Sequence, residues 1–153
     1  MDKQQFQQQV LSAEQMLYRV SKTLLFNDSD CADAVQEAIL RAWAALPTLR
    51  EERYFTTWLV RILINECHRI NGKKSRIVSI EAQPDRSEPP GDDNAALYEA
   101  LCRLPEKIRM TVELHYIEGY PVEDTAKILG VPVGTVKSRL SSGRKQLKSL
   151  LEE

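Results

Sequence analysis

The sequence lacks a long hydrophobic run: its apolar stretches are only a few residues long. A helix that spans a membrane needs about 20 consecutive apolar residues, so none is expected. The first residues, MDKQQFQQQV, also lack the charged-then-apolar order of a secretory signal. We therefore expect a cytoplasmic protein that does not insert into the membrane.

Metal-binding and catalytic patterns are also missing. The three cysteines, Cys31, Cys67 and Cys102, are far apart, with no CxxC motif and no histidine pair nearby, which disfavours a disulfide framework or a zinc site. We interpret them as small buried hydrophobic residues. His68 and His115 lack catalytic partners, and no paired-carboxylate, Ser/His/Asp or phosphate-loop arrangement is present. We expect no catalytic residue, metal site, cofactor or small-molecule substrate, and therefore no enzyme.

No alternating apolar and polar run is long enough to predict a strand, whereas helical spacing recurs through the chain. The exception is SRIVSIEAQPDRSEPPGDDN, which holds three of the seven prolines and little periodicity after Ile80. That composition is typical of a linker. The sequence predicts an all-α protein with two small helical domains, at 1–75 and 94–153, joined by a flexible linker at 76–93.

The first domain contains three amphipathic patterns. One helix ends near Phe26, a second begins at the capping residues NDSD and ends at Pro47, and a third runs from about Tyr54 to Gly72. Apolar residues at steps of three and four predict the buried faces. These are Phe6, Val10, Ala13, Leu17, Val20 and Leu24; then Cys31, Val35, Ala38, Ile39, Ala42 and Leu46; then Trp58, Leu59, Ile62, Leu63, Cys67 and Ile70.

Four helices fit in the second domain. Pro105 suits the first turn of the second of them, which runs to the break at EGYP. A third begins at Pro121 and closes at Gly130, and Pro132 opens the fourth. The first helix is expected to bury Leu97, Leu101 and Leu104.

The last two helices form a helix-turn-helix candidate. Its turn needs a small residue where the helices approach, a residue free to adopt positive φ, and an apolar anchor; Ala126, Gly130 and Val136 stand at these places. The inner stripe of the last helix is Val133, Val136, Leu140, Leu147 and Leu150. The opposite side holds Gly134, Ser138, Ser141, Ser142 and Lys145, with Lys137 and Lys148 beside them. A helix face made of small and basic residues suits the major groove of DNA.

The net charge of −1 argues against a nucleic-acid partner, but the basic residues are segregated. One basic stripe comprises Arg61, Arg69, Lys73, Lys74 and Arg76, and the other comprises Lys137, Arg139, Arg144, Lys145 and Lys148. An ordinary solvated helix in a small bundle would also explain one basic amphipathic helix. The turn, the two prolines and the basic face together favour DNA binding.

The stretch LPEKIRMTVELHYIEGYPVEDTAKILGVPVGTVKSRL resembles the C-terminal domain of the extracytoplasmic-function (ECF) group of bacterial sigma factors, and GTVKSRL is among that group's most characteristic strings. DCADAVQEAILRAWAAL and YFTTWLVRILINECHR resemble its N-terminal domain. The resemblance covers about 6–76 and 94–153. It implies a non-catalytic protein that binds core RNA polymerase and promoter DNA to direct transcription initiation. Many members of the group are also held inactive by an anti-sigma factor.

The resemblance also implies roles for residues of the first domain. The outward face of the second helix would bind core polymerase, through Asp30, Asp33, Glu37, Leu40 and Arg41. The third helix and the loop before it would open the −10 promoter element and hold a flipped base, through Tyr54, Arg61, Asn65, His68 and Arg69. Phe55 and Trp58 could stack on a base, but their helical phase favours the core. His68 could contact a phosphate or simply be solvated.

In the second domain the resemblance implies −35 recognition by Thr135, Lys137, Ser138, Arg139, Arg144 and Lys145. Arg144 lies near the edge of the apolar stripe, where it could lie along that stripe or bind a phosphate. Relatives commonly carry a bulky or basic residue near Ser142 and alanine near Gly143. Because a glycine inside a helix costs about 1 kcal/mol relative to alanine, we expect the last helix to bend or fray at Gly143.

The main alternative is a stand-alone helix-turn-helix regulator whose N-terminal half senses a signal or dimerises. That protein would bind duplex DNA tightly by itself, whereas a sigma factor would bind its promoter poorly until polymerase is added. A purely protein-binding helical adaptor would leave the turn chemistry unexplained.

Overall fold

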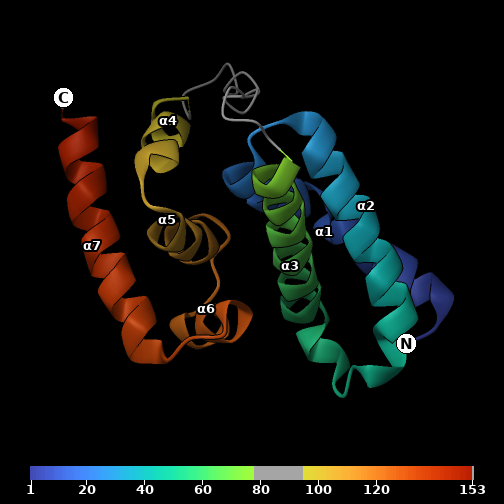
Figure 1. Ribbon diagram of the computed structural model, residues 1–153. Helices are drawn as coiled ribbons and strands as arrows, with labels where there is room; N and C mark the ends of the chain where they lie inside the picture. Colours follow the sequence, from blue (N-terminus) through green and yellow to red (C-terminus); the bar gives the residue numbers. More distant parts are fainter. Residues whose placement is uncertain (78–94, 153) are drawn as a thin grey trace. The chain divides into compact units, whose positions relative to one another are not determined.

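The computed structural model describes residues 1–77 and 95–152, and within these ranges it contains helices and no strand. The chain divides into two compact units, Met1–Asp85 and Arg86–Glu153 (Figure 1). The all-α prediction is confirmed. The predicted linker, apart from its first two residues, lies outside the described residues, so its flexibility and the domain boundaries stay predictions.

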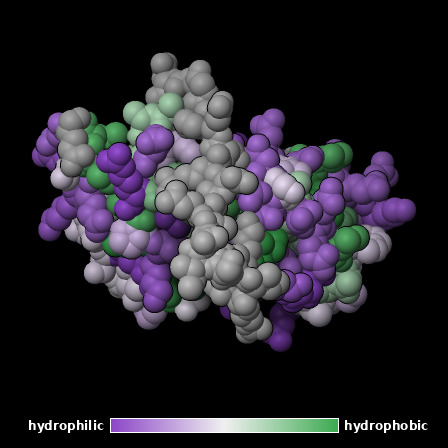
Figure 2. Space-filling model, turned by 45° about the horizontal axis from the view of Figure 1, so that its top comes forward, coloured by the Kyte–Doolittle hydropathy of each residue, from purple (hydrophilic) through white to green (hydrophobic). Residues whose placement is uncertain are grey.

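One face of the molecule is predominantly polar among the residues that the structure describes (Figure 2). In the face drawn in Figure 2, hydrophilic residues cover most of that surface and hydrophobic residues form small separate patches. Among the described residues, no helix combines the length and the apolar character needed to cross a membrane. In the same ranges, no cluster of three or more His, Cys, Asp or Glu side chains is arranged to hold a metal ion.

The first unit is a bundle of three helices, α1 (Lys3–Leu25), α2 (Asp28–Ala45) and α3 (Phe55–Ile77), each packed against the other two. All six residues predicted for the buried face of α1 are buried. Among the residues predicted for the second and third buried faces, those that are only half-buried are Ile39, Leu46, Trp58, Ile62 and Ile70. The core also holds Ala34, Val60 and Ile64, which were not predicted. A helix that contacts two neighbours buries a wider arc than one apolar stripe, which explains these additions.

Local signals set the ends of α1 and α2. The Asp2 carboxylate accepts a hydrogen bond from the backbone N–H of Gln5, and the Gln5 side chain accepts one from the backbone N–H of Asp2. This capping box fixes the start of α1. Phe26 ends α1 in the left-handed conformation, with φ 63°. Asn27 then caps α2 by accepting a hydrogen bond from the backbone N–H of Asp30.

Two short 3₁₀ helices, η1 (Leu46–Thr48) and η2 (Glu52–Tyr54), connect α2 to α3. Pro47 lies in η1, so α2 ends close to where it was predicted to end. The predicted end of α3 at Gly72 is wrong, because the helix continues to Ile77. A Cβ at Gly72 would meet nothing within 4 Å, and the next proline, Pro84, lies beyond the end of the helix. The glycine therefore lowers the local helix propensity without ending the helix.

Cys31 and Cys67 are buried in the first unit, whereas Cys102 is half-buried in the second. Burial raises the pKa of both the Cys31 and Cys67 thiols, so these thiols stay protonated and unreactive at neutral pH. The interpretation of the cysteines as small buried hydrophobic residues is confirmed for these two and holds only in part for Cys102.

The second unit contains the four predicted helices, and the second of them is extended by a π-helical segment, η3. The elements are α4 (Ala95–Arg103), α5 (Glu106–Val112), η3 (Glu113–Ile117), α6 (Val122–Leu129) and α7 (Val133–Leu151). Their core includes Leu101, Leu104, Val112, Ala126, Val136 and Leu140, and Leu97 packs half-buried against it. Pro105 is the N-cap residue of α5. It therefore stands just before the helix and not in its first turn.

α7 runs without a break through Gly143, so the predicted fraying there is wrong, whereas the predicted bend stays a prediction. Gly143 is buried, and a Cβ at this position would lie 2.6 Å from Cγ2 of Val112 and 3.2 Å from Cγ2 of Ile108. α5 therefore approaches α7 so closely that only a glycine fits. This packing holds α7 together at a residue of low helix propensity.

Candidate nucleic-acid interface

The connection between α6 and α7 has the geometry that a helix-turn-helix requires. Gly130 ends α6 in the left-handed conformation, with φ 68°. The backbone N–H groups of Gly130 and Val131 both donate to the Ala126 carbonyl, which closes the turn. Ala126 and Val136 are buried in the same core. The predicted turn is confirmed, and it fixes the direction in which α7 leaves α6.

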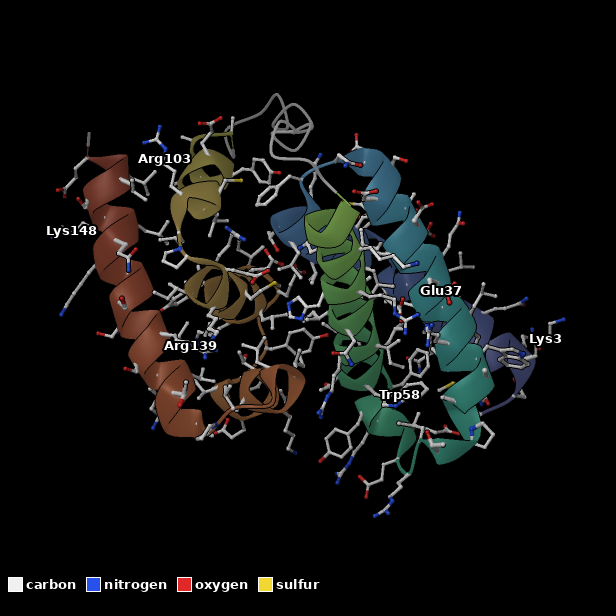
Figure 3. The ribbon with its side chains drawn as sticks, viewed as in Figure 1. Lys3, Glu37, Trp58, Arg103, Arg139 and Lys148 are labelled. Atoms are coloured by element: carbon white, nitrogen blue, oxygen red, sulfur yellow. The ribbon has the colours of Figure 1, made fainter. Side chains whose placement is uncertain are left out.

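One side of α7 is exposed and basic. The exposed residues are Gly134, Lys137, Ser138, Arg144, Lys145 and Lys148, whereas Thr135 and Arg139 are half-buried. Arg139 and Lys148 are labelled on α7 in Figure 3 and lie on different turns of this helix. Ser141 and Ser142 were predicted to face outward but are half-buried. Ser142 Oγ accepts a hydrogen bond from Gln146 Nε2 at 3.0 Å.

Arg144 does not lie along the apolar stripe of α7, which was one of its two predicted placements. The side chain is exposed, and its Nη1 donates a hydrogen bond to the hydroxyl of Tyr116 at 2.6 Å. A guanidinium has five N–H donors, so most of them stay available for another acceptor.

The outer face of α3 carries a second group of polar side chains. The exposed residues are Arg61, Asn65, His68 and Arg69, at relative positions i, i+4, i+7 and i+8, which share one side of a helix. Just before α3, Tyr54 is half-buried, with the Arg53 guanidinium 4.8 Å from its ring centroid. Phe55 is buried, as its helical phase predicted, and Trp58 is half-buried with its ring centroid 6.0 Å from that of Phe55.

The outward side of α2 combines acidic residues with an exposed leucine. Asp33, Glu37 and Leu40 are exposed, whereas Asp30 and Arg41 are half-buried. Leu40 is 64% exposed although it is a large hydrophobic residue, and Glu37 lies on the same helix one turn away (Figure 3). A partner-binding surface needs exposed hydrophobic side chains of this kind, whereas a single exposed leucine is also normal on a protein surface.

Each unit matches a known protein family. Residues 10–77 match the family Sigma-70 region 2, and residues 94–147 match the family Sigma-70, region 4. The chain belongs to the sigma-70 family. Sigma factors bind core RNA polymerase and direct it to promoters, so promoter recognition in transcription initiation is the function of this protein.

Similar proteins assign this sigma factor to the ECF group. It is 32% identical to the ECF RNA polymerase sigma factor SigM of Mycobacterium tuberculosis, over 98% of this chain and 79% of that protein. It is 32% identical to the ECF RNA polymerase sigma-E factor of Escherichia coli, over 80% of this chain and 74% of that one. The ECF RNA polymerase sigma factor SigW of Bacillus subtilis is 29% identical, over 90% and 83%. The resemblance drawn from the sequence is thus confirmed.

Solved structures support the same assignment. The co-crystal structure of the sigma factor RpoE with the anti-sigma factor NepR from Bartonella quintana matches with a TM-score of 0.84 and 29% identity, over 97% of each chain. The structure of CnrH in complex with the cytosolic domain of CnrY matches with a TM-score of 0.75 and 23% identity, over 99% of this chain and 90% of the other. The second likeness shows the shared fold.

Glu66 of this sigma factor is a buried carboxylate on α3 that was not predicted as a site residue. Its Oε1 lies 2.6 Å from Arg41 Nε on α2 and 3.7 Å from Arg69 Nη2 on the next turn of α3. Arg41 Nε is also 3.2 Å from Glu37 Oε1. The sequence signal that could have identified Glu66 is its position as a lone acid among the apolar residues of α3. It joins two arginines that belong to different predicted contact surfaces.

An open groove of about 460 Å³ lies between α2 and α3 next to this ion-pair network. Glu37 and Leu40 line it from α2, and Arg69 and Lys73 line it from α3. One wall is therefore acidic and apolar, and the other is basic. Three residues predicted for the polymerase surface, Asp33, Glu37 and Leu40, and one predicted for the −10 surface, Arg69, thus line the same groove in the first unit.

Proposed function

We propose that α7 recognises the −35 promoter element from the major groove. The residues concerned are Thr135, Lys137, Ser138, Arg139, Arg144 and Lys145. The proposal is supported by the exposed basic side of α7 and by the turn at Gly130, which presents that side away from the core. Lysine and arginine reach guanine edges and phosphates, and the small Ser138 permits close approach.

We propose that the first unit recognises and melts the −10 element with the exposed side of α3. The contacts are Tyr54, Arg61, Asn65, His68 and Arg69. Extruding a base costs a few kcal/mol, which hydrogen bonds and stacking in a protein pocket can offset. The Asn65 amide can both donate to and accept from a base edge. Tyr54 is half-buried next to this side of α3 and offers an aromatic ring for stacking.

We propose that core polymerase binds the outward side of α2, through Asp30, Asp33, Glu37, Leu40 and Arg41. Exposed Leu40 among charged neighbours supports this assignment. We also propose that the protein acts in the cytoplasm without catalytic activity and that an anti-sigma factor is one of its partners. The similar RpoE structure, which contains the anti-sigma factor NepR, supports the last point.

The observation that carries the proposal is the exposed basic side of α7 in a chain that also contains region 2. A test is transcription in vitro with purified core polymerase and a library of randomised promoters. Addition of the chain should select promoters with two spaced elements and redirect start sites. Unchanged start sites would contradict the proposal. A gel shift with and without core polymerase distinguishes the alternative, because a stand-alone regulator would bind its duplex tightly without polymerase.

Replacing Lys137 by alanine should weaken binding of the holoenzyme to promoters that depend on the −35 element. A good contact to a base edge contributes about 1–3 kcal/mol of discrimination, which corresponds to roughly 5- to 150-fold in affinity. Binding of core polymerase should not change, because Lys137 is exposed on the second unit. Filter binding of the reconstituted holoenzyme to a selected promoter measures the effect.

Lys107→Ala is the matched control, because Lys107 is an exposed lysine of the same unit on a different helix, α5. It should leave promoter affinity unchanged. A loss of core affinity in the Lys137→Ala variant, or equal losses of promoter affinity in both variants, would contradict the assignment of α7 to the −35 element.

A further inference from the structure

Tyr116 contacts the basic side of α7 although it lies 28 positions before Arg144 in the sequence. The Tyr116 hydroxyl accepts a hydrogen bond from Arg144 Nη1 at 2.6 Å. Both side chains are at the surface: Arg144 is exposed, and Tyr116 remains 47% exposed although it is a large aromatic residue. The contact therefore links η3 to α7 at the rim of the proposed DNA-binding surface.

The segment that carries Tyr116 is held in place from its other side. The His115 ring packs against the Tyr116 ring, with centroids 4.9 Å apart and an edge-on arrangement. His115 Nδ1 lies 2.7 Å from the Tyr120 carbonyl oxygen, so that nitrogen donates the hydrogen bond. η3 is also π-helical, and such wide turns occur frequently at functional sites because they redirect the side chains that follow. Tyr116 is thus placed by local structure before any ligand binds.

Arg144 keeps its positive charge available. Its partner Tyr116 is a neutral hydroxyl, and within the described residues no carboxylate forms an ion pair with Arg144. Four of the five N–H donors of the guanidinium remain free of the tyrosine. Arginine donates to phosphate through two parallel hydrogen bonds, and a guanidinium already held by one group loses less entropy when it does so.

The position of Arg144 on α7 suits the DNA backbone. It comes seven residues after Lys137 and four before Lys148, so the three side chains lie on one side of the helix. At about 1.5 Å per residue, Arg144 lies roughly 10 Å along the helix from Lys137. When the first turns of a recognition helix contact base edges in the groove, a residue that far along reaches the flanking phosphates.

We infer that Tyr116 is a positioning residue that holds Arg144 to bind one backbone phosphate of the −35 duplex. The inference rests on the proposed recognition of that element by α7. Arg144 makes the contact, and the tyrosine hydroxyl fixes the direction of its guanidinium. Arg144 is therefore assigned to a phosphate, whereas Lys137 and Ser138 are left to the base edges.

The test uses holoenzyme reconstituted from core polymerase and the full chain, with a promoter duplex selected from a randomised library. Each phosphate of the −35 region is replaced in turn by an uncharged methylphosphonate. With the unmodified chain, one replacement near the end of the element should weaken binding. Tyr116→Phe and Arg144→Gln should both become insensitive to that same replacement. Tyr116→Phe should lower affinity by roughly two- to tenfold on the normal duplex, as expected for one hydrogen bond.

The salt dependence and a double variant provide independent readouts. Loss of one phosphate contact should reduce the slope of log affinity against log salt by about 0.9 in each single variant. In the Arg144→Gln background, Tyr116→Phe should have no further effect. Tyr18→Phe is the matched control, because it removes a hydroxyl from a half-buried tyrosine of the first unit and should leave sensitivity to every phosphate unchanged.

Two results would overturn the inference: Tyr116→Phe keeps the full methylphosphonate pattern, or it weakens binding equally with and without Arg144. The Lys137→Ala variant separates these outcomes from failure of the proposed function. If Lys137→Ala weakens promoter binding and Tyr116→Phe does not alter the pattern, only the positioning role fails. If neither affects promoter binding, the assignment of α7 to the −35 element fails as well.

Discussion

Replacing Leu40 by aspartate should reduce the affinity of the chain for core RNA polymerase by about 30-fold or more. A hot-spot side chain of a protein interface contributes about 2 kcal/mol or more, which corresponds to roughly that factor, and we expect Leu40 to be such a residue. Aspartate removes the apolar contact and adds a charge next to the exposed Glu37. Titration of the fluorescently labelled chain with purified core polymerase measures the change.

The variant should remain folded, because Leu40 is 64% exposed on α2 and substitutions at exposed positions usually change stability by less than about 0.5 kcal/mol. Leu11→Asp is the matched control: Leu11 is 69% exposed on α1, outside the proposed interface. Circular dichroism should be the same for both variants. Unchanged core affinity in Leu40→Asp, or an equal loss in Leu11→Asp, would disprove the assignment of the polymerase surface to α2.

Replacing Gly143 by valine should destabilise the second unit by roughly 2–3 kcal/mol. Even a Cβ at this position would lie 2.6 Å from Val112 Cγ2, closer than two non-bonded carbon atoms normally approach. Val112 is buried and β-branched, so its side chain cannot rotate away freely. Overpacking of a core contact typically costs about 1–3 kcal/mol, and valine adds two methyl groups at the same contact. Amide hydrogen exchange measures the change separately for each helix.

Faster exchange is expected in α5 and α7, with unchanged exchange in α1, α2 and α3, whose core does not include Gly143. Gly72→Ala is the control for helix propensity, because a Cβ there meets nothing within 4 Å. It should stabilise α3 by up to about 1 kcal/mol. If Gly143→Val proves as stable as the unmodified chain, α5 and α7 are further apart than the close contact at Val112 requires.

The sequence predicted those features that depend on neighbours along the chain. Apolar spacing located the inner side of α1, and the capping side chain of Asn27 marked the start of α2. The turn at Gly130 was predicted from three residues close together in the sequence. Gly130 can adopt positive φ, Ala126 is small where the helices approach, and Val136 is an apolar anchor. Such signals act within a turn or two of helix, where the period of 3.6 residues determines which side chains share a side.

Features that depend on contacts between distant segments were missed or predicted wrongly. Helix propensity alone predicts that Gly143 weakens α7. The close approach of Val112 instead requires a glycine at this position. The pairing of Glu66 with Arg41 and that of Arg144 with Tyr116 join different elements. Residue spacing along one helix contains no information about which residue of another helix lies opposite. The placement of these side chains therefore required the packed structure.

The ion pair between Glu66 and Arg41 limits how this sigma factor can be re-engineered. Transplanting an α3 that has no acid at the position of Glu66, in order to change −10 preference, would remove the buried acid to which Arg41 of α2 is bound. Without that acid, Glu37 would be the remaining ion-pair partner of Arg41. The Arg41 side chain, which we propose contacts polymerase, would then adopt a different orientation. A chimera with new −10 specificity should therefore exchange α2 and α3 together.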